Sequence, residues 1–300
     1  MSLIVLGTVA LDHVKTPSGE RKELLGGSAT HVAMSARLFT PVHLVAVVGE
    51  DFPQRHLQFL KRKGIDIASV MIGPEKTFRW RGEYKEGDLN SAITLETVLG
   101  VLANYEPAIA HHQRRLPNVF LANIDPDVQR KLLNLMEKPR LIGLDSMNLW
   151  INTKRPALLK LMKDVDLFVA NDGEARAISG EQNLIKAAKA LRQMGPELVV
   201  VKKGEHGVVF YCDQFMFSFP AYPVEHVVDP TGAGDTFAGG LMGYLSQAKA
   251  LNEKSLKTAV IYATTLASFN VEGFGPEKTA PLTLPKVHQR MKVLKKFISF

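Results

Sequence analysis

Short apolar segments alternate with helix-like segments along most of this chain, and this alternation limits the folds that it can adopt. Strands joined by crossover helices pair in parallel, with helices covering both faces of the sheet. The strand-like runs lie at 3–6, 43–48, 119–121, 141–144, 167–169 and 198–202, and helix-like stretches lie between most of them at 29–39, 54–63, 126–137, 154–163 and 183–194. The sequence therefore predicts an α/β protein with a mostly parallel sheet. Ligands of such sheets gather beyond the carboxyl ends of the strands, where Asp12, Asp145, Asn171 and the loop at Asp229 emerge.

Two segments depart from this alternation. Residues 77–95 contain two strand-like runs around a turn-rich stretch, which is typical of a hairpin. Residues 10–24 carry the turn signal Pro17-Ser18-Gly19 between two further stretches. The sequence therefore predicts additional β structure outside the alternating part.

The composition is typical of a compact soluble enzyme. Of the 300 residues, 46% are hydrophobic and 22% are charged, which is enough for a large core in one extended domain. The single cysteine, Cys212, excludes an intrachain disulfide and suits a reducing cytosol, so we expect a cytoplasmic protein. The net charge is +7, but Lys and Arg are spread along the chain without a recognition motif, so nucleic acid is not an expected partner. The first residues lack a signal-peptide pattern, and no run of about 18 apolar residues occurs, so membrane insertion is not expected.

Residues 229–237, with the sequence DPTGAGDTF, combine two glycines and two carboxylates directly ahead of a helical pattern. Gly232 and Gly234 lack a β-carbon, so their backbone N–H groups can converge on an anion. The N-terminus of the following helix also favours negative charge. Asp235 lies one residue beyond the last glycine, where a base for an attacking hydroxyl would be needed. The segment is therefore predicted to bind a phosphate and to activate a hydroxyl, although a capped helix with a Gly-rich turn has similar residues.

This segment resembles the C-terminal motif of the ribokinase-like (PfkB) carbohydrate and nucleoside kinases, and the resemblance extends along nearly the whole chain. The other matching elements, in chain order, are the opening strand at 3–7, the glycine motif at 26–30, the loop at 49–51, the N-x-x-E element at 171–174 and the nucleotide-side loop at 203–207. One departure is His31, which occupies the position where most members carry an Asn that touches the sugar. This departure leaves the polar contacts to the acceptor open.

The resemblance implies a ribokinase-like three-layer αβα sandwich, forming a single kinase domain over residues 1–300, with a small β-sheet lid from about 10–24 and 74–100. It implies an ATP-dependent kinase that transfers the γ-phosphoryl group to a hydroxyl of a sugar or nucleoside. Asp235 would be the general base. Gly232, Ala233 and Gly234 would supply backbone N–H groups to the transferred phosphoryl oxygens.

On the nucleotide side, the resemblance implies that Asn171 and Glu174 help to place Mg²⁺, with Glu174 acting largely through water. A helix cap made by the same two residues remains an alternative. Lys203, Gly204 and Gly207 would form the loop over ATP. The adenine would lie between this loop and the helix 258–269, whose small-residue face is lined by Ala259, Tyr262, Ala263, Leu266 and Ala267 and is equally compatible with close packing on the sheet. Asp229 and Thr231 match positions that bind a monovalent cation such as K⁺ in some members.

On the acceptor side, the resemblance implies that Asp12 grips sugar hydroxyls, since a carboxylate can accept from two neighbouring hydroxyls. Gly26 and Gly27 would let the following helix approach the sugar closely. His31 is either a replacement hydrogen-bond partner or a buried structural histidine. Asn123 and Asp125 are further candidates for the acceptor pocket.

The identity of the acceptor depends on which face of the lid strand turns inward. Phe78, Trp80 and Tyr84 share one parity, and Arg79 and Arg81 share the other. Inward aromatic rings would stack on a nucleobase, whereas inward arginines would bind an acidic or phosphorylated sugar. The aromatic residues could instead join two lids in a homodimer. A non-catalytic nucleotide- or nucleoside-binding protein that keeps the fold is the alternative from another class.

Overall fold

The computed structural model describes residues 1–298, which contain a nine-stranded sheet and a four-stranded sheet. The large sheet has the order β13-β12-β11-β10-β9-β8-β1-β4-β5. Its strands are β1 (Leu3–Leu6), β4 (Val42–Gly49), β5 (Ile65–Gly73), β8 (Asn118–Leu121), β9 (Leu141–Asp145), β10 (Leu167–Asn171), β11 (Leu198–Lys202), β12 (Val208–Tyr211) and β13 (Met216–Phe219). All neighbours from β5 to β11 pair in parallel, and β12 and β13 add an antiparallel hairpin at the edge.

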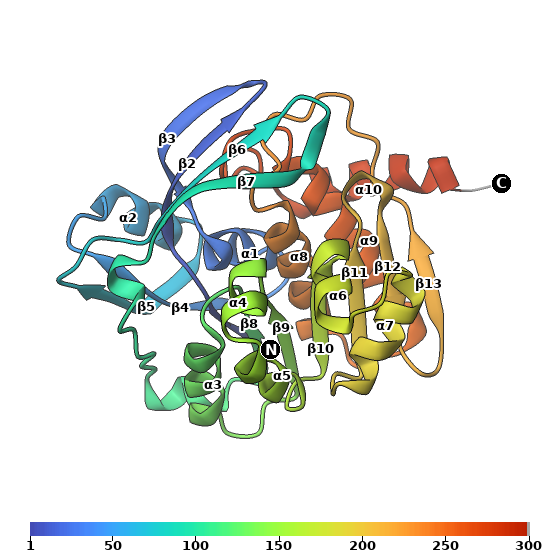
Figure 1. Ribbon diagram of the computed structural model, residues 1–300, viewed down its shortest axis with the longest axis horizontal. Coiled ribbons are helices and arrows are strands. Elements are labelled where there is room, and N and C mark those ends of the chain that lie inside the picture. Colours follow the sequence, from blue (N-terminus) through green and yellow to red (C-terminus); the bar gives the residue numbers. More distant parts are fainter. Residues whose placement is uncertain (299–300) are drawn as a thin grey trace.

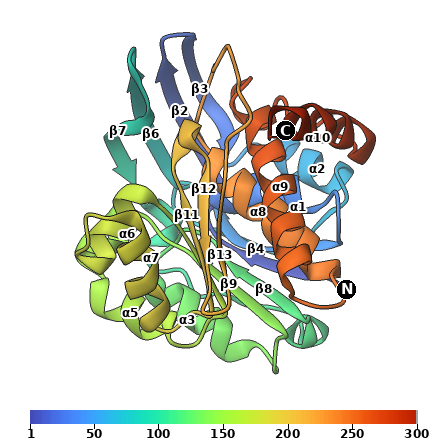
Figure 2. The same ribbon diagram turned by 90° about the vertical axis from the view of Figure 1, so that its right-hand side faces the viewer.

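Helices cover both faces of this sheet, as Figure 2 shows, so the three layers are helix, sheet and helix. On one face lie α1 (Ser28–Ala36), α2 (Gln54–Arg62), α8 (Ala233–Gln247) and α9 (Glu253–Asn270), with α10 (Leu284–Ile298) packed outside α9. On the other face lie α3 (Pro126–Leu135), α4 (Asn148–Thr153), α5 (Arg155–Met162), α6 (Asp172–Ser179) and α7 (Leu184–Gln193). Short 3₁₀ helices occur at Gly100–Leu102, His111–Arg115 and Gly204–His206.

The strands are buried because they are apolar on both sides, as expected for a sheet covered by two helical layers. Leu3, Ile4, Val5 and Leu6 of β1 are all fully buried and alternate between the two core clusters. The chain passes from β1 to β4 on one side, and β8 later pairs on the other side. This reversal of strand order opens a crevice at the carboxyl ends of β1 and β8, where ligands of such sheets bind.

The small sheet projects from the edge of the molecule above the carboxyl ends of the main strands (Figure 1). We call it the lid sheet. Its strands, in the order β3-β2-β6-β7, are β2 (Ala10–Thr16), β3 (Gly19–Gly26), β6 (Arg79–Lys85) and β7 (Asp88–Val98). The hairpin predicted at 77–95 is present as β6 and β7, and the turn predicted at Pro17 joins β2 to β3.

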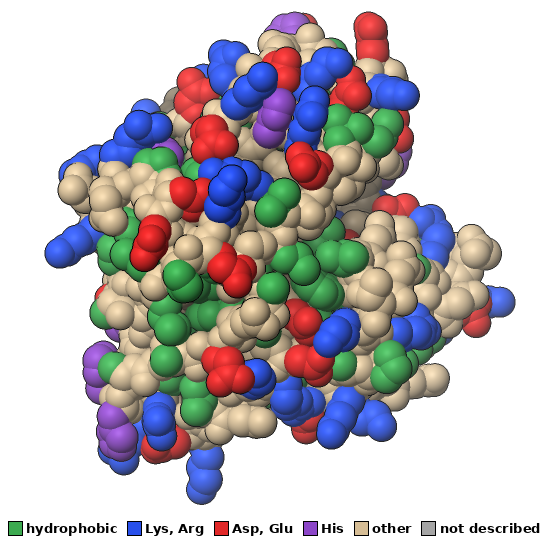
Figure 3. All heavy atoms as spheres, turned by 60° about the vertical axis from the view of Figure 1, so that its left-hand side comes forward, with side chains coloured by type: hydrophobic (Ala, Val, Ile, Leu, Met, Phe, Trp, Pro, Cys, Tyr) green, Lys and Arg blue, Asp and Glu red, His purple; other side chains and the backbone are tan. Residues whose placement is uncertain are grey.

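Exposed apolar side chains occur near this sheet. Met71 and Ile72 of β5 and Ile93 and Leu95 of β7 are among the exposed large hydrophobic residues. Figure 3 shows hydrophobic side chains gathered in a band across one face of the molecule. This band interrupts a surface that is otherwise charged and polar.

Candidate active site

A cavity of about 1280 Å³ lies between the lid sheet and the carboxyl ends of the main strands. Its walls come from the ends of β1, β8, β10 and β11, from the start of α8, and from β6 and β7 of the lid sheet. Its size is sufficient for two small ligands. The cavity contains most of the site residues predicted from sequence: Asp12, Gly27, His31, Asn123, Asn171, Glu174, Lys203, Gly204, Gly207, Thr231, Gly232, Ala233, Gly234 and Asp235.

The loop from Asp229 to Gly232 forms one end of this cavity. Asp229 is fully buried, and its carboxylate oxygens accept from the backbone N–H groups of Thr231 (2.9 Å) and Gly275 (3.3 Å). Gly232 has a left-handed backbone with φ of 73° and caps α8. Among residues 1–298, no group accepts a hydrogen bond from the N–H of Gly232 or Gly234. The loop and the helix start therefore present free donors to an anion.

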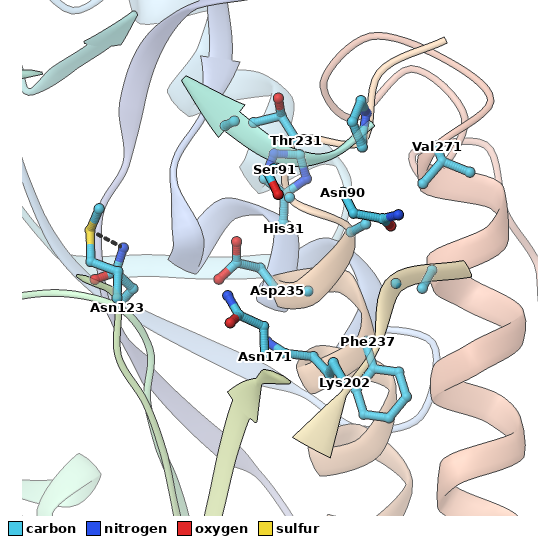
Figure 4. Close-up of a pocket in the computed structure, with 18 of the residues that line it drawn as sticks. His31, Asn90, Ser91, Asn123, Asn171, Lys202, Thr231, Asp235, Phe237 and Val271 are labelled. Atoms are coloured by element: carbon cyan, nitrogen blue, oxygen red, sulfur yellow. Dashed lines mark hydrogen bonds between the residues drawn. The ribbon is translucent and has the colours of Figure 1, made fainter. Parts of the chain in front are cut away.

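Asp235 lies in the first turn of α8 and faces the cavity, as Figure 4 shows. Burial raises the pKa of its carboxyl, and the ammonium of Lys202 opposes this rise. A carboxylate with a raised pKa in a pocket is suited to accept a proton from a hydroxyl.

Asn171 and Glu174 join the end of β10 to the start of α6. The Asn171 side chain accepts from the N–H of Glu174 (2.8 Å), and the Glu174 carboxylate accepts from the N–H of Asn171 (2.7 Å), which is a capping box. Burial and the neighbouring Asp145 raise the pKa of Glu174 to about 8. The capping alternative is thus present, and both residues still line the cavity.

Within residues 1–298, no cluster of three or more His, Cys, Asp or Glu is placed to hold a metal ion. A hydrated Mg²⁺ bound through one carboxylate and the phosphates does not need such a cluster. The lone Glu174 fits that mode of binding.

Two charged residues beside Glu174 were missed as site residues. Lys202 ends β11, and its ammonium pairs with Asp145 at the end of β9 (3.2 Å). The sequence predicts that Asp145 lies at this edge of the sheet but assigns it no function. Nothing in the residues around Lys202 distinguishes it from the lysine that follows it. Only the parallel pairing of β9, β10 and β11 brings the two together.

Asn270, at the end of α9, was also missed. Its amide N–H donates to the carbonyl of Thr231 (2.7 Å), and its oxygen accepts from the hydroxyl of Thr236 (2.9 Å) and pairs with Nδ1 of His31 (3.2 Å). Because that oxygen is an acceptor, Nδ1 of His31 carries the proton and Nε2 is left as an acceptor. Burial lowers the pKa of His31, which keeps the ring neutral. Asn270 therefore fixes both the loop from Asp229 to Gly232, which we call the anion loop, and the tautomer of His31.

Asp12 packs closely against the end of β3, where Gly26 is followed by Gly27. The Asp12 carboxylate accepts from the N–H of Gly27 (3.2 Å), and a Cβ added to Gly26 would lie 1.8 Å from one of its oxygens. Gly27 has a φ of 90°, and a Cβ there would lie 2.4 Å from the carbonyl oxygen of Thr8. Burial raises the pKa of Asp12 to about 7, and the charges of Asp229 and Asp235 add to this effect. Gly26 thus makes room for this buried carboxylate, and Gly27 lets the chain pass close to the backbone of Thr8.

The lid sheet presents its aromatic residues to the cavity. Phe78, Trp80 and Tyr84 line it. Arg79 instead forms ion pairs with Asp51 (2.7 Å) and Glu23 (3.4 Å). Of the two orientations that the sequence left open, the structure therefore has the one in which the aromatic residues face the cavity.

Asn123 lies across the cavity, with its oxygen accepting from the indole N–H of Trp150 (3.0 Å) and its amide N–H directed at the sulfur of Met147 (3.1 Å; Figure 4). Met147 and Trp150, which sequence reasoning missed, line the same wall. Asp125 instead caps α3 through the N–H of Asp127 and pairs with Lys154 (3.5 Å).

The nucleotide-side loop follows β11. The N–H of Lys203 donates to the carbonyl of Gly207 (2.7 Å), and Gly204 and Gly207 have φ values of 55° and 85°. Asn90 of the lid sheet reaches this loop, where its amide donates to Glu205 (3.2 Å). The lid sheet thus touches the nucleotide-side loop across the cavity.

The prediction of which residues of the helix 258–269 face the adenine is largely wrong. Ala259, Ala263 and Leu266 are fully buried in the core, and Tyr262 packs on Tyr244. The side of α9 that lines the cavity consists of Thr264, Ala267, Ser268 and then Val271. Small residues on this helix mostly serve close packing, which the alternative interpretation had allowed.

This geometry has counterparts in known proteins. The family model "pfkB family carbohydrate kinase" matches residues 5–282. The chain belongs to the pfkB family. It is 34% identical to the cytidine kinase of Thermococcus kodakarensis over 260 residues, which cover 84% of this chain and 91% of that protein. It is 28% identical to a nucleoside kinase of Methanothermobacter thermautotrophicus over 301 residues, covering 94% and 93% of the two chains.

The structure resembles that of the Burkholderia thailandensis nucleoside kinase in complex with inosine, with a TM-score of 0.79, 17% identity and coverage of 97% of each chain. The predicted ribokinase-like fold is confirmed, and so is the prediction of a phosphotransferase acting on an alcohol group. PfkB kinases of this fold use ATP and Mg²⁺. No helix among the described residues of this pfkB kinase has the length and apolar character needed to span a bilayer.

Proposed function

We propose that this pfkB kinase transfers the γ-phosphoryl group of ATP to a hydroxyl of a nucleoside. The observation that carries this proposal is the inward turn of Phe78 and Trp80, which gives the cavity an aromatic wall for a nucleobase. An acidic or phosphorylated sugar is not favoured, because Arg79 of the same strand forms its ion pairs outside the cavity. Two curated relatives are named cytidine kinase and nucleoside kinase, which agrees with this choice.

On the acceptor side, Asp12 accepts hydrogen bonds from the ribosyl hydroxyls; Gly26 leaves room for its carboxylate, and Gly27 lines the cavity beside it. Nε2 of His31 accepts from a further hydroxyl, in place of the Asn that most members carry. The amide N–H of Asn123 has only a thioether as partner among the described residues, so it is available to a base carbonyl.

At the reacting centre, Asp235 takes the proton of the acceptor hydroxyl. The free N–H groups of Gly232 and Gly234 hold the transferred phosphoryl oxygens, whereas the N–H of Ala233 donates to the carbonyl of Pro230 (3.1 Å). Lys203, Gly204 and Gly207 hold the nucleotide, and Asn171 and Glu174 orient the hydrated Mg²⁺. Bound Mg²⁺ supplies charge neutralisation at the phosphates.

A monovalent cation such as K⁺ beside Asp229 and Thr231 is part of the proposal. No Lys or Arg among the described residues pairs with Asp229, so this fully buried carboxylate has no permanently cationic side chain beside it to offset its charge. A homodimer through the lid sheet is supported by the exposed Ile93 and Leu95 on β7. A cytoplasmic location stays a prediction.

The test is ADP release with ATP and Mg²⁺ across nucleosides, free sugars and acidic or phosphorylated sugars, with and without K⁺. We expect turnover on nucleosides. Asp235→Asn is expected to lower kcat by roughly 10²- to 10⁴-fold while nucleoside affinity, measured by calorimetry, is kept. Turnover on acidic sugars alone would overturn the acceptor assignment. Full activity of Asp235→Asn would overturn the assignment of Asp235 as the general base. Nucleoside binding without turnover in the unmodified protein would favour a non-catalytic binding protein.

A further inference from the structure

Lys202 places a positive charge at the reacting end of the cavity. Its side chain is 16% exposed and lines the cavity together with Asn171 and Asp235, which come from β10 and α8 (Figure 4). The carboxylates of Asp145, Glu174 and Asp235 all act on its charge. Together they raise its pKa against the effect of burial, so Lys202 stays charged in the cavity.

The ammonium lies against the first turn of α8. A Cβ added to Gly234 would lie 2.8 Å from Nζ of Lys202. The N–H groups of Gly232 and Gly234, without acceptors in the described chain, belong to the same turn. A cation and free N–H donors therefore converge where an anion would sit.

Lys202 also has donors to spare. An ammonium has three N–H groups, and among residues 1–298 only Asp145 accepts one of them. Asp145 is 4% exposed and itself accepts from the N–H of Ser146 (2.8 Å), so its carboxylate is held in place. The pair thus fixes the direction of the ammonium without saturating it.

We propose that Lys202 contacts the transferred phosphoryl group and stabilises its charge during transfer, and that Asp145 is the positioning residue that holds Lys202. This inference rests on the proposed site at Asp235. In the step itself, the acceptor oxygen forms a bond to the γ-phosphorus while the bond from that phosphorus to the β,γ-bridging oxygen breaks, and ADP leaves. The hydroxyl proton goes to Asp235, and Lys202 stays protonated throughout.

The competing explanation is that Lys202 only neutralises the buried carboxylates. A charge-neutral double variant separates the two. Lys202→Met alone leaves Asp145 unpaired and can impair folding. Asp145→Asn combined with Lys202→Met removes both charges of the pair and restores a neutral, hydrogen-bonding side chain. A purely neutralising lysine would make this double variant active again.

We expect Lys202→Met to lower kcat by about 100-fold or more, which is typical for loss of a group that stabilises transition-state charge. The double variant should recover the melting temperature of the unmodified protein, but its kcat should stay as low as that of Lys202→Met. Lys189→Met, on the exposed face of α7, applies the same substitution away from the cavity and should leave kcat unchanged. Recovery of at least half of the wild-type kcat in the double variant would overturn the proposal.

Binding gives a readout that does not depend on turnover. In the double variant, calorimetry should show an affinity loss of about tenfold for a non-hydrolysable ATP analogue and a smaller loss for ADP, because only the analogue carries the γ-group. An equal loss of affinity for both nucleotides, or no loss for either, would overturn the proposed contact between Lys202 and the γ-phosphoryl group. Failure of the proposed base is seen separately, as unchanged turnover of Asp235→Asn with Lys202 intact.

Discussion

The two sides of the cavity are built from different parts of the molecule. The phosphate side consists of the ends of β10 and β11 and the start of α8, a helix whose residues from Thr236 to Met242 are all buried. The acceptor side depends on the lid sheet, where β7 is exposed along almost its whole length. This sheet is anchored by a small cluster of Val14, Tyr84 and Phe274 and by Leu11 and Leu25 of β2 and β3, which join the main core. The phosphate side is thus fixed by backbone and core, whereas the acceptor side relies on side chains of an outlying sheet. Changes on the first side should therefore affect turnover, and changes on the second should affect acceptor affinity.

The strongest test of this contrast is Gly232→Ala, with Gly180→Ala as its matched control. The two glycines share nearly the same left-handed backbone, with φ and ψ of 73° and 5° at Gly232 and 76° and 1° at Gly180. Alanine should cost each about 1 kcal/mol of stability. Only at Gly232 would the new Cβ meet a neighbour, 2.4 Å from the ring of His31, whereas nothing lies within 4 Å at Gly180.

We therefore expect Gly232→Ala to lower kcat by roughly 100-fold through displacement of the anion loop, and Gly180→Ala to leave kcat within about twofold. Steady-state kinetics and thermal unfolding of both variants check this. If both variants kept the wild-type kcat, the backbone of the loop would not be the feature that fixes the phosphate side.

On the lid sheet, Trp80→Ala should raise the KM for the nucleoside by about 10- to 100-fold, because stacking on a base contributes roughly 1–3 kcal/mol. The KM for ATP should change little, and kcat should stay within a few-fold. Arg81→Ala is the control, since Arg81 neighbours Trp80 on the same strand but is exposed and does not line the cavity. An unchanged nucleoside KM in Trp80→Ala would remove the aromatic wall from the acceptor site.

The third test uses the raised pKa of Asp12, which is about 7. The ionised carboxylate accepts from the ribosyl hydroxyls, so a proton must leave before the nucleoside binds. Nucleoside affinity should therefore fall by about tenfold for each pH unit below 7 and should be level above it. The measurement is calorimetry without nucleotide between pH 5.5 and 8.5 in Asp235→Asn, which removes a second titrating carboxyl. Because the charge of Asp235 contributes to the raised pKa of Asp12, the break in this variant should lie below that of the unmodified protein. Adding Asp12→Asn should weaken binding and flatten the profile. A pH dependence that survived in this double variant would come from another group.

These contrasts also explain how much the sequence could predict. Most parallel strands and most helices were predictable because their apolar patterns are local, although β5 was not among the predicted runs. The anion loop was predictable because its glycines and Asp235 are contiguous. The inward face of β6 was not, since Trp80 and Arg79 differ only in parity and the side that faces the cavity depends on the pairing of β6 with β2. Lys202 and Asn270 carry no local signal, and both enter the site only because distant segments meet there. The adenine-facing side of α9 was predicted wrongly, because small residues look the same whether they pack on a sheet or line a cavity.

The smallest expected effect concerns the place where the two sides touch. The amide of Asn90, on β7, donates to Glu205 in the nucleotide-side loop, and a Cβ on Gly204 would lie 1.9 Å from the Asn90 side-chain oxygen. If nucleotide binding orders this loop, it should also favour the lid position seen here, and nucleoside and nucleotide should each raise the affinity for the other. An exposed hydrogen bond contributes about 0.5–1 kcal/mol, so the coupling should be roughly two- to fivefold.

Asn90→Ala should bring that coupling close to one, whereas Glu86→Ala, in the exposed turn of the same hairpin, should leave it intact. The measurement is nucleoside affinity with and without a non-hydrolysable ATP analogue, by calorimetry. Loss of coupling in Asn90→Ala with kcat unchanged at saturation would mean that the two sides communicate through the lid tip alone. Coupling that persists in Asn90→Ala would mean that the two sides of the cavity communicate through its floor, where the charge of Asp235 acts on Asp12. The acceptor side would then be less independent of the core than its exposed lid sheet suggests.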